Sequence, residues 1–285
     1  MSAQIAELVN SKWLIHHEAI LGYIPSFISY INGNQMAIQP DPAVLAKKKP
    51  FVIAKAGDIN LVTRWDLEDQ NLPELSVAVI PIQGALTSYN TMNLATYVQQ
   101  AEAHPNIISI LFLINTPGGM VFYTDICTNI IKNCSKPTIG FVLQMCASAG
   151  MWLASAMDYR IVSSELDRIG SIGVMTSVSN LNTFLKEKLG IDIEEIYATK
   201  SENKNLQWKE FLKGNFKPIV EDLDYTNEIF HQTIITNLGI DKDSPVFKGD
   251  TYFAKEAIKL GLANEINTID YAIQYAITEG YKSSF

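Results

Sequence analysis

Apolar residues gather in short runs along the middle of the chain, and each run ends at small residues. Ile107–Ile114 is apolar except for Ser109, which suits a buried strand and is too short for a typical helix. Pro117, Gly118 and Gly119 follow directly. Proline lacks a backbone donor and glycine adopts backbone angles that other residues resist, so we expect the strand to end in a tight turn.

Two further runs repeat this arrangement. Thr138–Leu143 precedes Ala147–Gly150, in which every neighbour of Ser148 is small. Tyr159–Val162 precedes Gly170–Gly173. Open α/β sheets place their chemistry at the carboxyl ends of their strands, so these small-residue segments are the candidates for a site.

Helical segments alternate with the predicted strands. Ser76–Ile80 adds another strand by its β-branched content, and Asn90 or Thr91 is the expected N-cap of the helix that follows it. The helices expected here cover Met92–Ala103, Thr124–Asn133 and Ser148–Met157. Such alternation predicts an α/β fold with βαβ units and a largely parallel sheet.

The last third of the chain reads as mostly helical. Its predicted helices are Asn182–Leu189, Leu206–Leu238 with an interruption near Gly214 and Pro218, Tyr252–Leu260, and Ile269–Glu279 with Thr268 as N-cap. Its predicted strands are Ile191–Tyr197 and Leu262–Ile266.

The first quarter has a different character. Residues 1–35 have short helical patterns, including Trp13–Ile15, whereas residues 36–75 contain several prolines and read as loops. We therefore predict two parts: an N-terminal extension over 1–75, used as an assembly arm or propeptide, and a main domain over 76–285 that holds the small-residue segments.

Composition and charge limit the domain size and the kinds of ligand that we expect. The 285 residues are 47% hydrophobic, enough for one large domain or two small ones. A net charge of −8 argues against a nucleic-acid partner. The three cysteines have no metal-like spacing and the four histidines are scattered, so we expect no metal and no cofactor.

No membrane segment is predicted either. The N-terminus lacks the pattern of a signal peptide, and the nearest candidate span, Gly140–Met157, contains Gln144, Ser148 and Ser155. We therefore expect a cytoplasmic protein with free thiols.

Ser148 is the leading candidate for chemistry. A serine at a strand-to-helix turn lies at the positive end of the helix dipole, and the N–H of Ala149 would point toward an oxyanion there. The alternative is a serine that merely caps the helix. The Pro-Gly-Gly turn could supply a second oxyanion donor and pair with an extended peptide, or it could be an ordinary tight turn.

A serine nucleophile needs a base, and no histidine lies in these segments. A Ser-His-Asp triad is therefore poorly supported, whereas a lysine can take the place of histidine. Lys200 and Lys204 follow the predicted strand Ile191–Tyr197. Each could equally be a solvated charge in a polar loop.

Four motifs in order resemble the signal peptide peptidase A family of serine peptidases. They are I-N-T-P-G-G at Ile114–Gly119, A-S-A-G at Ala147–Gly150, G-S-I-G-V at Gly170–Val174 and K-x-A-x-x-x-G-L-A-N-E-I at Lys255–Ile266. The likeness covers roughly Ser76 to Ile277. It implies a Clp/crotonase-like fold of repeated ββα units and a Ser-Lys dyad.

The resemblance also implies roles for single residues. Ser148 matches the nucleophile, Gly119 and Ala149 match the oxyanion donors, and Ser171 matches a serine that helps to hold the lysine. The position after the predicted strand favours Lys204 as the base.

One departure makes the lysine the uncertain match, between Lys204 and Lys200, and keeps a catalytically silent assembly protein as an alternative. The family has a glycine-containing segment before its lysine, and Ala198–Asn205 has no glycine.

The N-terminal Trp13–Ile15 and the lack of a membrane helix resemble the soluble phage and prophage branch, whose members process capsid or scaffold proteins. We therefore predict a Ser-Lys endopeptidase that binds its substrate as an extended strand. We expect it to form a homo-oligomeric ring, to meet capsid or portal proteins, and to act in the host cytoplasm or prohead interior. The alternatives are a soluble peptidase that degrades signal peptides, a crotonase-like acyl-CoA enzyme and a catalytically silent assembly protein.

Overall fold

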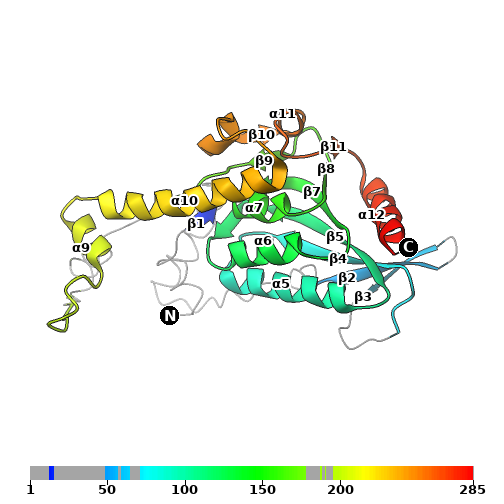
Figure 1. Cartoon of the computed structure of the whole chain (residues 1–285), viewed down its shortest axis with the longest axis horizontal. Helices are drawn as coiled ribbons and strands as arrows, with labels where there is room; N and C mark the ends of the chain where they lie inside the picture. Colours follow the sequence, from blue (N-terminus) through cyan, green and yellow to red (C-terminus); the bar gives the residue numbers. More distant parts are fainter. Residues whose placement is uncertain are drawn as a thin grey trace.

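A mixed sheet with helices on both faces forms the body of the chain (Figure 1). The computed structural model describes residues 13–15, 49–56, 59–64, 71–177, 187, 190 and 195–284. Nine strands form the main sheet: β2 (Phe51–Ala56), β3 (Ile59–Arg64), β4 (Ser76–Gln83), β5 (Ile107–Thr116), β7 (Thr138–Ala147), β8 (Tyr159–Val162), β9 (Arg168–Gly170), β10 (Thr251–Phe253) and β11 (Glu265–Ile266).

The central pairs of this sheet are parallel. The order is β10-β9-β7-β5-β4-β2-β3, with β8 beside β7 and β11 beside β8. β4, β5, β7, β8 and β9 pair in parallel, whereas β2, β3 and β10 pair antiparallel. The predicted α/β fold with a largely parallel sheet is confirmed, and the carboxyl ends of β5, β7 and β9 lie at one edge.

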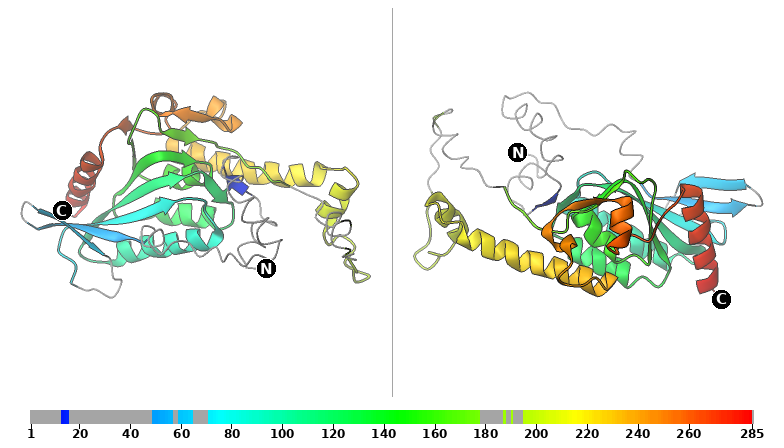
Figure 2. Two further views of the ribbon diagram at one scale, coloured as in Figure 1. Left: turned by 180° about the vertical axis from the view of Figure 1, so that it is seen from behind. Right: turned by 90° about the horizontal axis from the view of Figure 1, so that it is seen from above.

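Helices cover both sides of the sheet (Figures 1 and 2). α5 (Ser88–Ala103), α6 (Thr124–Lys132) and α7 (Ala149–Ser155) lie on one face, and α12 (Ile269–Ser283) lies on the other. The remaining helices are α9 (Leu206–Leu212), α10 (Lys217–Leu238), the 3-10 helix η1 (Pro245–Lys248) and α11 (Ala254–Lys259).

This two-sided cover explains the apolar run in β5. Ile110, Phe112 and Ile114 join the core beneath α5, α6 and α7. Leu111, between them, joins the second core, on the face that α12 covers. Strands buried on both faces have nearly continuous apolar sequences and not alternating ones.

α10 is attached to the body through its C-terminal half. Phe230 stacks on Trp152 of α7 with ring centroids 4.5 Å apart and planes 8° from parallel. Asn237 also donates from Nδ2 to Oγ of Ser155, at 3.1 Å. The N-terminal half of α10 and α9 project away from the body (Figure 2).

The N-terminal quarter differs from the prediction. Trp13–Ile15 forms a strand, β1, and not a helix; it pairs with β6 (Gly118–Met120). Residues 49–75 are not only loops, because β2 and β3 form a hairpin whose first strand pairs with β4. Pairing with strands far along the chain outweighed a weak local pattern. The other expected elements before residue 49 lie outside the described residues, and the division at residue 75 stays a prediction.

Several boundaries also shift. α5 begins at Ser88 with Thr87 as its N-cap, so Asn90 and Thr91 are helical. β10 takes the first residues of the helix expected at Tyr252–Leu260, and the strand expected at Leu262–Ile266 shortens to β11. Residues 251–253 are a strand and not part of the helix because Tyr252 pairs with Ile169 of β9, a contact that the local sequence does not encode.

Two other predictions are confirmed, and two lie largely outside the described residues. The interruption between α9 and α10 falls near Gly214 and Pro218, and Thr268 caps α12 by accepting from the N–H of Tyr271. The described residues of the strand expected at Ile191–Tyr197, 195–197, form no strand. The helix expected at Asn182–Leu189 lies almost wholly outside the described residues. Among the helices that the structure describes, none combines the length and apolar character needed to cross a membrane.

We expect Phe230→Ala to lower the free energy of unfolding by about 3–5 kcal/mol, because it removes a buried ring and leaves a cavity beside Trp152. Urea denaturation followed by circular dichroism measures the change. Tyr225→Ala is the matched control on the same helix, since Tyr225 is 70% exposed, and we expect it to change stability by less than about 0.5 kcal/mol. Equal losses in both variants would contradict the anchoring role of Phe230.

Candidate active site

Ser148 has the backbone of a strained turn and not that of a helix cap. It follows β7 directly, with φ 54° and ψ −118°, and is 1% exposed. Its side chain makes no capping hydrogen bond to α7. A non-glycine residue at such a φ carries strain that the surrounding structure must hold in place, and such strain clusters at functional sites.

Backbone hydrogen bonds hold Ser148 in this conformation. Its N–H donates to the carbonyl of Gly170 at 2.8 Å, and its own carbonyl accepts from the N–H of Trp152 at 2.9 Å. Ser171, the residue after Gly170, also has a positive φ, 54°, and its N–H donates to the carbonyl of Asp250 at 2.7 Å. Ser148 and Ser171 therefore follow directly on paired residues of β7 and β9.

The Pro-Gly-Gly segment is a short strand, β6, and not simply a tight turn. Thr116 fixes its start: its Oγ1 donates to the carbonyl of Gly84 at 2.6 Å and accepts from the N–H of Gly118 at 3.1 Å. The chain can leave β5 this sharply because Gly118 has φ 100°.

Gly119 lies so close to Leu86 that no side chain fits. A Cβ on Gly119 would lie 2.0 Å from the Leu86 carbonyl oxygen. The N–H of Leu86 donates to the carbonyl of Gly118, and the N–H of Met120 donates to the carbonyl of Leu86, both at 2.8 Å. The backbone of Leu86 therefore fills the hydrogen-bonding positions on one side of β6.

Gly150 brings α7 against the end of β5. A Cβ there would lie 2.3 Å from Cγ2 of Thr116. The same threonine binds Gly118, so α7 and β6 are positioned by one side chain. The first N–H groups of a helix have no partner within it, so the N–H of Ala149 is available at this edge. Ser148, Ala149, Gly119 and Ser171 are therefore brought together.

The neighbouring thiol does not compete with Ser148. Cys146 is buried at the end of β7, and burial raises the pKa of its thiol to about 12. A thiol in that state is protonated near neutral pH and is a poor nucleophile. The hydroxyl of Ser148 is therefore the candidate nucleophile at this strand end.

The two candidate lysines lie elsewhere, in the segment that we call the arm, residues 195–225. Lys200 and Lys204 are exposed and precede α9, which lies beyond the N-terminal end of α10 (Figure 1). Between Phe230, which contacts α7, and Lys217, α10 extends for about 20 Å. The structure therefore does not bring either lysine to Ser148 of the same chain.

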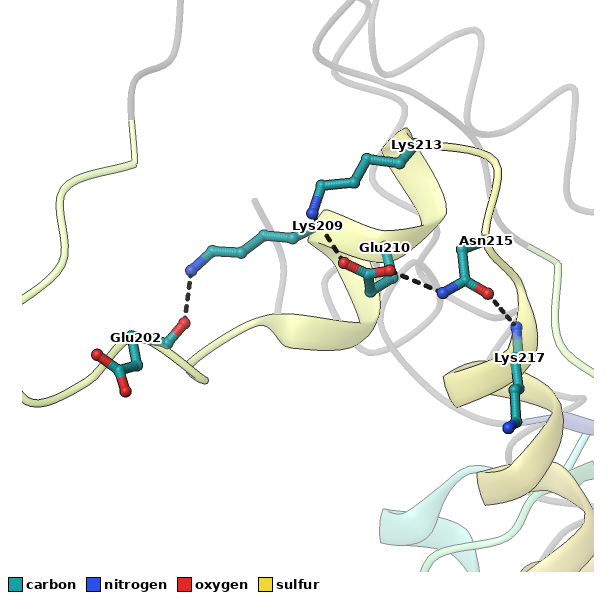
Figure 3. Close-up of polar contacts among 6 residues, drawn as sticks. All are labelled: Glu202, Lys209, Glu210, Lys213, Asn215 and Lys217. Atoms are coloured by element: carbon teal, nitrogen blue, oxygen red, sulfur yellow. Dashed lines mark hydrogen bonds and ion pairs between the residues drawn. The ribbon is translucent and has the colours of Figure 1, made fainter.

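Polar contacts brace the arm internally (Figure 3). Lys209 donates from Nζ to the carbonyl of Glu202 at 2.9 Å, which ties the segment that carries Lys204 to α9. Glu210 binds Nζ of Lys213 at 2.8 Å and Nδ2 of Asn215 at 2.7 Å, and these bonds hold the pKa of Glu210 below its usual value. Asn215 in turn accepts from the N–H of Lys217, at 3.2 Å. These contacts connect the segment that carries Lys204 to α9 and to the start of α10.

Lys136 and Lys248 are two further lysines that could be considered as the base for Ser148. Burial lowers the pKa of Lys136, but this side chain donates to the carbonyls of Ala101 and His104 at the opposite end of β7, about 30 Å from Ser148. Lys248 is closer, because Gly249 packs against Gly173, and Asp250 accepts from Ser171. Sequence reasoning did not consider Lys248, which no motif marks.

The histidines that the structure describes have packing or turn roles. Burial lowers the pKa of His231, whose ring lies 4.8 Å from that of Phe247. His104 accepts from the N–H of Asn106 through Nδ1. Within the described ranges, His, Cys, Asp and Glu side chains do not gather in groups of three that could hold a metal ion.

Comparisons with known proteins agree with the motifs. Residues 131–280 match the family described as Peptidase family S49, a range that contains Ser148, Ser171 and both candidate lysines. The chain is 32% identical to the capsid assembly protease C of Escherichia phage lambda over 68% of this chain and 47% of the relative. It is 24% identical to protease 4 of Haemophilus influenzae over 74% of this chain and 35% of the relative. The chain thus spans less than half the length of either relative.

We expect Gly150→Ala to destabilise the fold by about 1–3 kcal/mol, because the new methyl group would overlap Cγ2 of Thr116. Thr116→Ser is the matched change, since it removes that methyl group and keeps the hydroxyl that binds Gly118. The double variant should recover most of the loss in a urea unfolding series. Additive losses in the double variant would show that the two side chains do not meet as described.

Proposed function

This chain belongs to peptidase family S49, and from that premise we propose that it is a serine endopeptidase with Ser148 as nucleophile. The observation that carries the proposal is Ser148 itself, which is strained, makes no capping hydrogen bond to α7 and lies at the strand end where α7 contacts β6. The order of strands and helices is consistent with a Clp/crotonase-like fold, which we propose as the finer description.

In the proposed reaction, a neutral lysine, Lys204, takes the proton of the Ser148 hydroxyl. The Ser148 oxygen attacks the peptide carbonyl, and the N–H groups of Gly119 and Ala149 stabilise the oxyanion. The lysine then protonates the leaving amine, and water hydrolyses the acyl-enzyme. Ser171, which follows the strand beside Ser148, would help to orient the lysine.

A lysine works as a base only in its neutral form, which burial favours over the charged form. In the single chain Lys204 is exposed, and its own Ser148 is out of reach. We therefore propose that the arm carries Lys204 to Ser148 of a second copy, where the contact would remove water from both groups.

The surface of the arm supports this association. Six large apolar side chains are exposed on it: Ile196, Leu206, Leu212, Phe216, Val220 and Tyr225. Exposed apolar groups of this extent are typical of interaction surfaces. A heterologous contact between one chain's arm and the next chain's body closes into a ring when the rotation allows it, which is the homo-oligomer that we propose.

The substrate class follows from the relatives. The similarity to a capsid assembly protease favours capsid, scaffold or portal proteins as substrates, cut in the host cytoplasm or the prohead interior. The second candidate is a peptidase that degrades signal peptides, because a protein named as a signal peptide peptidase is also among the relatives. A crotonase-like acyl-CoA enzyme would share the oxyanion donors but would need neither the serine nor the lysine, and a silent assembly protein would need none of these groups.

Purified chain incubated with the neighbouring capsid or scaffold protein should produce fragments, and Ser148→Ala should reduce their rate of formation about a thousandfold or more, because the nucleophile is lost. Intact mass spectrometry identifies the fragments. A fluorophosphonate probe should label the wild type and not the variant, with a Ser135→Ala chain as labelled control. Absence of both fragments and labelling would favour the silent assembly protein, and capture on immobilised coenzyme A would favour the acyl-CoA enzyme.

Co-expression of Ser148→Ala and Lys204→Ala chains should restore cleavage, although each variant alone is inactive. In a randomly mixed ring, about one quarter of the sites would join an intact serine to an intact lysine of the next chain. Cleavage of a fluorogenic peptide measures the recovery. If the mixture stays inactive while Lys200→Ala or Lys248→Ala alone abolishes cleavage, the base must be reassigned to that lysine.

A further inference from the structure

β1 pairs with β6, a strand that lies far from it along the sequence. Trp13, Leu14 and Ile15 pair antiparallel with Met120, Gly119 and Gly118, respectively. More than a hundred residues separate the two strands along the chain. Both figures draw β1 at the end of the body from which α10 projects (Figures 1 and 2).

The backbone of β6 shows which of its groups face β1. The carbonyl of Gly118 and the N–H of Met120 bind Leu86, so they point to the same side of β6. Successive backbone groups along a strand alternate between its two sides. The N–H and carbonyl of Gly119 therefore point to the other side, where Leu14 lies opposite.

Only that second side of β6 can accept another strand. The first side is filled by Leu86, which lies too close to Gly119 for even a methyl group between them. An extended substrate that pairs with β6 must therefore use the backbone groups that β1 uses. The N–H of Gly119, the proposed oxyanion donor, is among them.

From this pairing we infer that Trp13–Ile15 is an internal occupant of the substrate site. The inference rests on the proposed function in one respect, the assignment of Gly119 to the oxyanion hole. It assigns the substrate a direction, antiparallel to β6, and a register in which the residue in place of Leu14 turns its carbonyl toward Gly119. The occupant is itself an apolar tripeptide, so the favoured substrate class is an extended apolar segment.

The occupant is suited to displacement and not to permanent closure. β1 has three residues, and a backbone hydrogen bond contributes only modestly to net stability because the free groups bind water instead. When a site is open for only a fraction of the time, the apparent affinity for a ligand falls by that fraction. β1 thus weakens substrate binding without abolishing it.

Leu14→Pro tests the inference in a full-length Ser148→Ala chain, which cannot process itself or the probe through Ser148. The N–H of Leu14 faces Gly119, so proline there breaks the pairing. Ile15→Pro is the matched control, because the N–H of residue 15 points away from β6 and extended backbone suits proline. The probe is a fluorescein-labelled peptide of residues 9–19, VNSKWLIHHEA, added in trans.

We expect Leu14→Pro to tighten binding of this peptide about threefold to tenfold, measured by fluorescence anisotropy, and Ile15→Pro to leave it within about twofold of the parent chain. The Leu14→Pro chain should also discriminate between two N-methylated peptides. Methylation of the peptide's Leu14 nitrogen should weaken binding, and methylation of its Ile15 nitrogen should not.

The outcomes separate this inference from the peptidase proposal. If Leu14→Pro binds the peptide more tightly but the wild type cleaves nothing, the assignment of β1 as an occupant is supported and the proposed peptidase activity is contradicted. Unchanged binding, equal effects of both proline variants, or no binding to any variant would overturn the occupant, even if the wild type cleaves capsid protein through Ser148.

Discussion

The close contact between the first turn of α7 and the end of β5 is the constraint on which the rest of the site depends. Gly150 leaves no room for a Cβ beside Thr116, and Thr116 in turn holds Gly118 at the start of β6. Ser148 must turn sharply, with φ 54°, for the chain to enter α7 at this place. The strain is held because α7 is wholly buried and Trp152 stacks on Phe230. The rigid packing of α7 in the core therefore fixes the position of Ser148 at the edge of the sheet.

The parts that sequence predicted correctly are those that local pattern determines. Ile107–Ile114 is apolar because both faces of β5 are covered, and a buried strand of that kind is evident from composition alone. The turn from strand to helix at Ser148 was also predicted from its small neighbours, and Gly150 supplies the physical reason for a small residue there. The break between α9 and α10 follows from Gly214 and Pro218, residues that end or begin helices by their own backbone chemistry.

The parts that sequence could not predict are set by partners far along the chain. Trp13–Ile15 is too short for any periodicity, and it is a strand only because β6 lies beside it. β10 is likewise defined by its pairing with β9. The distance between Lys204 and Ser148 could not be predicted for a similar reason: no motif fixes it, and it depends on the length and direction of α10. Spacing along a sequence carries no such information.

Taken with the two proposals, the geometry implies that a single chain is an incomplete peptidase in two independent ways. The proposed base is remote from Ser148 because α10 carries it outward, and the proposed oxyanion donor Gly119 is faced by the chain's own β1. Different events relieve the two conditions, since association supplies a lysine and a substrate strand displaces β1. Neither event needs the core to change, because the three-residue strand and the arm both lie outside the rigid contact of α7 with β5. Activity would then depend on the local concentration of both the chain and its substrate.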